Sequence, residues 1–278
     1  MTPDATDALR AWLAASAVEF SLDAATPFPA FTSTVLGSGD LVLRWYDPDP
    51  WILPLEPDIV AREVAALGVV AGIAEVPAPS LVAWSEAAPS AVLMTRLPGT
   101  TEVWPPDVGA LRDLLAVLHA TPPGALAGFH PYRGYYRGHD WPKPAWWRDP
   151  ALWERVAAAA AAGPPPAPSV LIHRDFHPDN VLWTTGRITG VVDWANAGVG
   201  PAAMDVAHFR VNLATLHGPA VADELLPGEP AWDIEAALGF LEWGPGLDTW
   251  AGAWPAVPAT QARAWLESFV ARAAAALG

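Results

Sequence analysis

The stretch HRDFHPDN at positions 173–180 decides how the rest of the chain is interpreted. The apolar run Val170–Ile172 precedes it and is typical of a buried strand. A second short run, Val181–Trp183, follows it directly, and a third run ends at Val191–Asp193 after a turn. The pattern places polar side chains at strand ends or in the adjoining loop, where a scaffold holds them rigidly and a substrate can still reach them. These side chains are Asp175, Asn180 and Asp193.

The types and spacing of these three residues indicate a specific chemistry. A carboxylate and an amide oxygen on adjacent elements, Asp193 and Asn180, can bind a hard cation such as Mg²⁺ and leave positions for phosphate oxygens and water. A second carboxylate, Asp175, can then orient an attacking hydroxyl or accept its proton. Phosphoryl transfer requires this combination of positioning, charge neutralisation and an aligned nucleophile.

Composition restricts the class of protein. The 278 residues are 52% hydrophobic and 16% charged, which excludes general disorder. The sequence has no cysteine, no basic patch and no apolar run long enough for a membrane span, so we expect a cytoplasmic protein that binds neither nucleic acid nor membrane. The net charge of −15 fits either a solubilising surface or a field that attracts a cationic partner.

The order of the expected elements predicts an α+β fold of two lobes, a small β-rich N-lobe and a larger, mainly helical C-lobe. A hairpin around residues 31–45 and strands at 80–84 and 90–95 accompany one helix at 58–67 in the first lobe. We place the lobes at 1–97 and 98–278, with a connector at the Pro98-Gly99 pair. Further helices are expected at 7–20, 107–119, 151–162, 202–216 and 258–277.

The motif HRDFHPDN, followed by VVDW at 191–194, resembles the aminoglycoside phosphotransferase family, whose relatives are choline kinases and eukaryotic protein kinases. The family pattern is close to H-G-D-x-H-x-x-N, followed by an apolar strand that ends in I-D-W or a variant. The resemblance extends loosely to Arg44 on a strand, to Glu63 on the next helix, and to the hinge-like segment Leu93–Gly99. It implies a protein-kinase-like fold with an N-terminal nucleotide-binding lobe and a C-terminal catalytic and acceptor-binding lobe.

The resemblance also implies roles for individual residues. Asp175 would be the catalytic base, and Asn180 and Asp193 would complete the catalytic set by holding Mg²⁺. His173 and Asp205 would brace the catalytic loop. The nucleotide, ATP or GTP, would be bound by an Arg44–Glu63 pair near its phosphates and by the hinge around its adenine; the residues expected to bind it are Ser33, Thr34, Arg44, Glu63, Met94, Thr95 and Arg96.

The chain departs from the family pattern at two places. The expected phosphate loop, 27–34, contains no glycine, so its phosphate contacts would come from Ser33 and Thr34. Arg174 replaces the glycine that usually follows the first histidine of the motif, a change that we expect to have little effect.

The sequence does not identify the acceptor, and two other classes of function are compatible with it. The acceptor would be a small molecule, either an antibiotic or a metabolite, and acidic residues in the second lobe favour a cationic one: Glu224, Asp233, Glu235, Glu242 and Asp248. A role in antibiotic resistance and a monomeric or homodimeric state are both compatible with the sequence. The alternatives are a kinase-like module that binds nucleotide without catalysis, and a metal-dependent hydrolase that uses His173, Asp175 and His177 on one strand face.

Overall fold

The computed structural model describes residues 3–30, 32–46, 52–102, 104, 107–122, 126, 129–132, 143–242 and 257–278. The chain divides into two compact units: unit 1 comprises Met1–Glu102 and Asn180–Ala197, and unit 2 comprises Val103–Asp179 and Gly198–Gly278. Unit 1 is built on antiparallel sheets and unit 2 is mainly helical, which confirms the predicted α+β class. The assignment of nucleotide binding to 1–97 and of acceptor binding to 98–278 stays a prediction.

The main sheet of unit 1 has five antiparallel strands. In spatial order they are β1 (Thr26–Phe28), β2 (Thr34–Ser38), β3 (Leu41–Trp45), β5 (Ala91–Thr95) and β4 (Leu81–Ser85). The predicted hairpin is confirmed as β2 and β3, which pair from Thr34–Trp45 to Ser38–Leu41. Its two-residue turn contains Gly39 at φ +56°, a backbone conformation that glycine adopts without steric cost.

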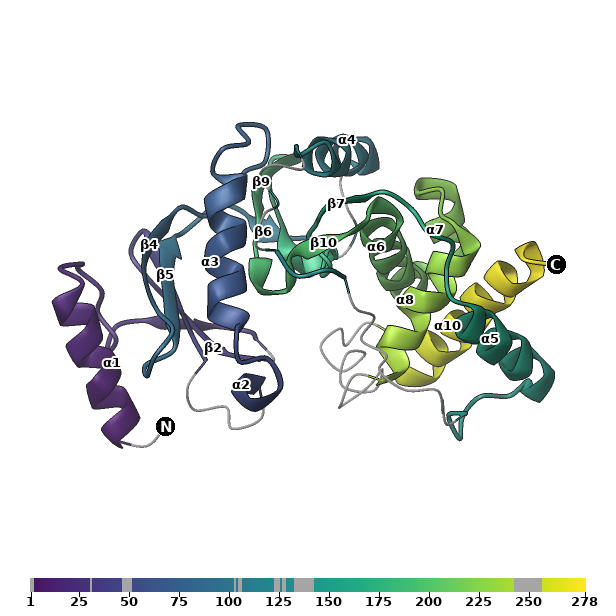
Figure 1. Ribbon diagram of the computed structural model, residues 1–278, viewed down its shortest axis with the longest axis horizontal. Coiled ribbons are helices and arrows are strands. Elements are labelled where there is room, and N and C mark those ends of the chain that lie inside the picture. Colours follow the sequence, from purple (N-terminus) through teal and green to yellow (C-terminus); the bar gives the residue numbers. More distant parts are fainter. Residues whose placement is uncertain are drawn as a thin grey trace. The chain divides into compact units, whose positions relative to one another are not determined.

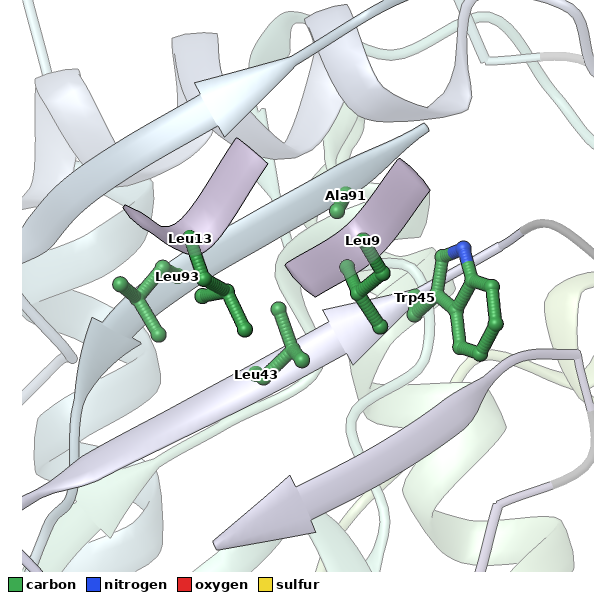
Figure 2. Close-up of a cluster of buried hydrophobic side chains, with 6 residues drawn as sticks. All are labelled: Leu9, Leu13, Leu43, Trp45, Ala91 and Leu93. Atoms are coloured by element: carbon green, nitrogen blue, oxygen red, sulfur yellow. The ribbon is translucent and has the colours of Figure 1, made fainter. Parts of the chain in front are cut away.

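Two helices, α1 (Pro3–Ala15) and α3 (Ile59–Val70), cover opposite faces of this sheet (Figure 1). Leu43 and Trp45 on β3 pack with α1 in a buried cluster (Figure 2). Side chains alternate along a strand, so Arg44 points to the opposite face, toward α3. The apolar cluster comprises Leu9, Leu13, Leu43, Trp45, Ala91 and Leu93, and a short helix, α2 (Ile52–Leu55), precedes α3.

A second, three-stranded antiparallel sheet in unit 1 contains the strand that follows Asn180 and the strand that precedes Asp193. Its strands, in spatial order, are β6 (Thr100–Thr101), β8 (Val181–Thr184) and β9 (Arg187–Val191). Thr185 and Gly186 join β8 to β9 with φ of +49° and +76°. Positive φ at both central residues is what a two-residue hairpin turn requires when its twist matches that of the strands. The 3₁₀ turn η3 (Trp194–Asn196) follows β9 and packs against α3.

Unit 2 surrounds the helix α6 (Ala202–His217), which is buried along almost its whole length. It packs against the antiparallel strand pair β7 (Ser169–Ile172) and β10 (Gly198–Pro201), and against the helices that follow it in sequence. These are α7 (Pro219–Leu225), α8 (Pro230–Glu242) and α10 (Ala259–Ala276), while α4 (Val108–His119) contacts β7 and α5 (Pro150–Ala162) contacts α8 and α10. The 3₁₀ turn η2 (Pro178–Asn180) ends the loop after β7. Among the described residues, no helix has the length and apolar character of a membrane span.

Candidate active site

A buried carboxylate on α6 fixes the backbone of the loop that follows β7. Asp205 is completely buried, and its Oδ2 accepts hydrogen bonds from the backbone N–H of His173 at 2.9 Å and from Nε2 of His119 at 3.0 Å. Its Oδ1 accepts the backbone N–H of Arg174 at 2.7 Å. Three donors therefore compensate the desolvation of one carboxylate, and they hold the start of the loop against the core of unit 2.

The loop begins with a left-handed residue. Arg174 has φ +68°, which L-residues with a Cβ adopt at a steric cost. The expectation that replacing the family's glycine changes little is therefore incomplete, because this is a position where glycine is favoured. Two contacts offset the cost: the backbone N–H of Arg174 bonds Asp205, and its guanidinium lies 5.8 Å from the centre of the Tyr132 ring.

Asp175, the predicted base, lies between two imidazoles. Nε2 of His208 is 3.1 Å from Asp175 Oδ1, and Nε2 of His177 is 3.7 Å from the same oxygen. Burial raises the pKa of the Asp175 carboxyl, but the positive potential of these imidazoles outweighs it, so the pKa lies well below its usual value. The neighbouring Asp179 has a pKa raised to about 6 by burial and by the charge of Asp175. Asp175 is thus the ionised carboxylate of the loop, and 24% of its side-chain surface stays exposed.

The array of His173, Asp175 and His177 does not lie on a strand, because β7 ends at Ile172 and Arg174 is left-handed. His173 is completely buried, whereas His177 is partly exposed and its Nδ1 accepts the backbone N–H of Asp179 at 3.3 Å. The described residues contain no group of three or more His, Cys, Asp or Glu side chains that could hold one metal ion. The prediction that these three residues share one face of a strand, on which the hydrolase alternative depended, is therefore wrong.

In unit 1, Arg44 on β3 lies between two carboxylates. Its Nε is 3.5 Å from Glu63 Oε1 on α3, and its Nη1 donates to Asp193 Oδ1 at 2.5 Å. The hydroxyl of Tyr46 donates to Glu63 Oε2 at 2.9 Å. Burial raises the pKa of the Glu63 carboxyl, although the charge of Arg44 opposes the shift. Strand alternation places Arg44 and Tyr46 on one face, so a buried network of opposite charges forms where the resemblance implied the Arg44–Glu63 pair.

Asn180 and Asp193, the two predicted metal ligands, belong to neighbouring backbone segments of unit 1. The N–H of Val192 donates to the backbone oxygen of Asn180 at 3.0 Å. Asp193 follows β9 with φ +66°, and 29% of its side chain is exposed. One amide oxygen and one carboxylate are hard oxygen donors that fit Mg²⁺, which usually keeps several waters and takes few protein ligands.

The residues of the five-stranded sheet that were predicted to contact the nucleotide differ in their burial and in their hydrogen-bond partners. Ser33, just before β2, has a buried Oγ without a hydrogen-bond partner in the part of the chain that the structure describes, and Thr34 is the first residue of β2. Met94 is buried in β5. The N–H of Thr95 donates to Ser80 O at 2.9 Å and the N–H of Arg96 donates to Asp40 O at 2.7 Å, so these two hinge amides already have partners.

The acidic residues considered as contacts for a cationic acceptor differ in their exposure and in the partners they already have. Asp233 is buried, and both of its oxygens accept from Arg210, which also donates to Asp223. Glu235 accepts a hydrogen bond from the Tyr132 hydroxyl at 3.2 Å, and Glu224 is exposed on α7. Asp233 therefore stabilises the packing of α6 and α8. Asp248 and the side chain of Glu242 lie outside the described residues.

Three residues of the site were not singled out for these roles from the sequence: Tyr46, His119 and His208. Two of them could have been found by spacing. Tyr46 directly follows β3 and lies two residues from Arg44, and His208 lies three residues from Asp205 on α6, so each shares a face with a residue that was noted. His119 has no such local relation to Asp205, which is distant in sequence.

The sequence and the fold were compared with those of known proteins. A family model described as the phosphotransferase enzyme family (APH) matches residues 31–238. No curated protein sequence matches the chain significantly.

Solved structures resemble the chain in fold, each at a sequence identity below 25%. The macrolide 2'-phosphotransferase MphH from Brachybacterium faecium is 23% identical, with a TM-score of 0.55 over 95% of this chain and 98% of that one. A choline/ethanolamine kinase family protein from Mesorhizobium loti is 22% identical, with a TM-score of 0.55 over 98% and 94%. A thermostable mutant of aminoglycoside phosphotransferase APH(4)-Ia, in a ternary complex with AMP-PNP and hygromycin B, is 18% identical, with a TM-score of 0.55 over 91% and 95%.

Proposed function

Because the chain belongs to the phosphotransferase enzyme family, we propose that it is a small-molecule kinase, which transfers the γ-phosphoryl group of ATP or GTP to a hydroxyl group. The observation that carries this proposal is the state of Asp175. Its carboxylate is ionised, partly exposed, and placed on a loop whose backbone is fixed by a buried aspartate. An ionised carboxylate held in this way can accept a hydrogen bond from an acceptor hydroxyl and take its proton as the new P–O bond forms.

The residues of unit 1 would bind the nucleotide. Arg44 carries a permanent positive charge that Glu63 and Asp193 orient, so its guanidinium can contact the α- and β-phosphates. The hydroxyl of Ser33, which has no hydrogen-bond partner among the described residues, and the adjacent Thr34 would contact the phosphates. The Met94–Arg96 segment would contact the adenine. Binding of AMP-PNP by the structurally similar APH(4)-Ia mutant supports the use of a nucleoside triphosphate.

Asn180 and Asp193 would hold Mg²⁺, which neutralises charge on the phosphate oxygens when it is bound. Arg44 occupies Oδ1 of Asp193, and its guanidinium therefore restrains the orientation of the carboxylate. The acceptor is a small molecule, for which the hygromycin B bound by the APH(4)-Ia mutant is one model. Cytoplasmic location, a monomeric or homodimeric state and a role in antibiotic resistance stay predictions.

An acceptor panel tests the proposed function. The purified chain is incubated with Mg²⁺ and ATP or GTP, with hygromycin B, a macrolide, choline and simple sugars as separate acceptors, and nucleoside diphosphate release is measured. We expect release to be stimulated by one class of acceptor, with a new phosphate monoester visible by ³¹P NMR. Nucleotide binding without stimulation by any acceptor would favour a non-catalytic module, and activity restored by Zn²⁺ but not by Mg²⁺ would favour a hydrolase.

A further inference from the structure

His208 lies on α6, one turn after Asp205, and its only role described so far is to help lower the pKa of Asp175. Its side chain is buried, with 7% exposed, and its Nε2 is 3.1 Å from Asp175 Oδ1. Residues three positions apart share a face of a helix. One face of α6 therefore supplies both the carboxylate that fixes the loop backbone and an imidazole that contacts the side chain of the predicted base.

The direction of this hydrogen bond follows from the charge on Asp175. An ionised carboxylate has only acceptor atoms, so the hydrogen must be on Nε2 of His208. His177 approaches the same oxygen with its Nε2, but at 3.7 Å the contact is too long for a hydrogen bond. His208 is thus the closer donor of the two imidazoles.

The two histidines also differ in what holds them. His177 belongs to the same loop as Asp175, whereas His208 belongs to a helix that packs against α7, α8 and α10. The backbone oxygen of His208 accepts a hydrogen bond from Asn212 Nδ2 at 2.8 Å, and its ring lies 6.0 Å from the ring of Phe240. The contact with His208 therefore links the Asp175 carboxylate to the packed core of unit 2.

We propose that His208 is a positioning residue, which donates from Nε2 to Asp175 Oδ1 and holds the carboxylate in the orientation that contacts the acceptor hydroxyl. This inference rests on the proposed function of Asp175. Loss of the donor would leave the carboxylate free to rotate about its side-chain bonds, and misplacement of a reacting group by about 1 Å can reduce the rate about 100-fold.

Two variants separate the hydrogen bond from the space that the ring fills. His208→Leu removes the donor but still fills part of the space of the ring, whereas His208→Gln keeps an N–H donor at a position similar to Nε2. With Mg²⁺, ATP and the acceptor that gives the highest turnover in the panel, we expect His208→Leu to lower kcat about 10- to 100-fold. The KM for ATP should stay unchanged, and His208→Gln should restore most of the lost kcat.

His217→Leu is the matched control, because His217 ends the same helix and packs against Trp104. Its kcat should equal that of wild type, and melting temperatures should show that all three variants are folded. If His208→Leu does not fold, the kcat of His208→Gln relative to His208→Asn, which cannot place its amide as far along, provides the same comparison.

The outcomes distinguish this inference from the proposed function. An active wild type with equal kcat for all folded His208 variants would overturn the positioning role and leave the function standing. A fall in kcat that Gln does not restore better than Leu or Asn would also overturn it. A wild type that releases no diphosphate with any acceptor would overturn the proposed function, and the positioning role with it.

Discussion

Replacement of Asp205 by asparagine should weaken the loop that carries Asp175. The Asp205 carboxylate accepts three hydrogen bonds, two at Oδ2 and one at Oδ1. An asparagine has one acceptor oxygen. If this oxygen occupies the Oδ2 position, it keeps the bonds from His173 N–H and His119 Nε2, but its NH₂ group then faces the N–H of Arg174.

The cost can be worked out from these contacts. The variant loses one charge-assisted hydrogen bond, worth about 2 kcal/mol, and leaves buried donors facing each other, at about 1 kcal/mol more. We therefore expect the free energy of unfolding of Asp205→Asn to fall by about 3 kcal/mol, which corresponds to a melting temperature lower by roughly 6 to 12 °C. kcat should also fall, because the loop backbone is no longer fixed.

Urea denaturation and differential scanning calorimetry measure the change. Asp113→Asn is the matched control, since Asp113 is exposed on α4 and should change the free energy of unfolding by less than about 0.5 kcal/mol. If Asp205→Asn were as stable as this control, the hydrogen bonds to Asp205 would not be what fixes the loop.

Three further predictions follow from the geometry of the site. Because Arg174 has φ +68°, Arg174→Gly should be more stable than Arg174→Ala by about 1 kcal/mol, the reverse of the order at ordinary positions; equal urea midpoints would contradict this. Tyr46→Phe removes the hydroxyl that donates to the buried Glu63 and should lower the free energy of unfolding by about 1 to 2 kcal/mol; an unchanged urea midpoint would show that this bond contributes nothing. The base must be deprotonated, and the pKa of Asp175 is lowered, so its loss of kcat on acidification should begin only below about pH 4; a kcat that halves near the usual carboxyl pKa would refute the shift.

Periodicity and turn residues predicted most of the fold. The hairpin of β2 and β3, the helices α3, α4, α5, α6 and α10, and the strands β4 and β5 appear within a few residues of their predicted positions. The first helix was predicted to continue to Phe20 but ends at Ala15, because the Ser16 hydroxyl bonds Trp12 O and Ala17 adopts φ +53°. A left-handed alanine has no signature in the sequence, so this end could not be found from pattern alone.

The site was predictable where local spacing carries the information. Asp175 and Asn180 lie in one motif, and the pairing of Arg44 with Glu63 came from the resemblance. The partners of Asp175 and Asp205 were not predicted, because His208 and His119 reach them across long sequence separations set by the packing of α6 and α4. The engagement of the Thr95 and Arg96 amides likewise depends on Ser80 and Asp40, which tertiary structure brings to them.

The turnover of Asp175→Asn tests the central claim most directly. Asparagine keeps the shape of the side chain but cannot take a proton, so kcat with Mg²⁺, ATP and the best acceptor should fall about 10²- to 10⁴-fold. Stabilisation of the protein against heat by Mg²⁺ and ATP should persist, because in our proposal nucleotide binding belongs to other residues. If Asp175→Asn instead kept kcat within a few-fold of wild type under these conditions, Asp175 would not be the catalytic base.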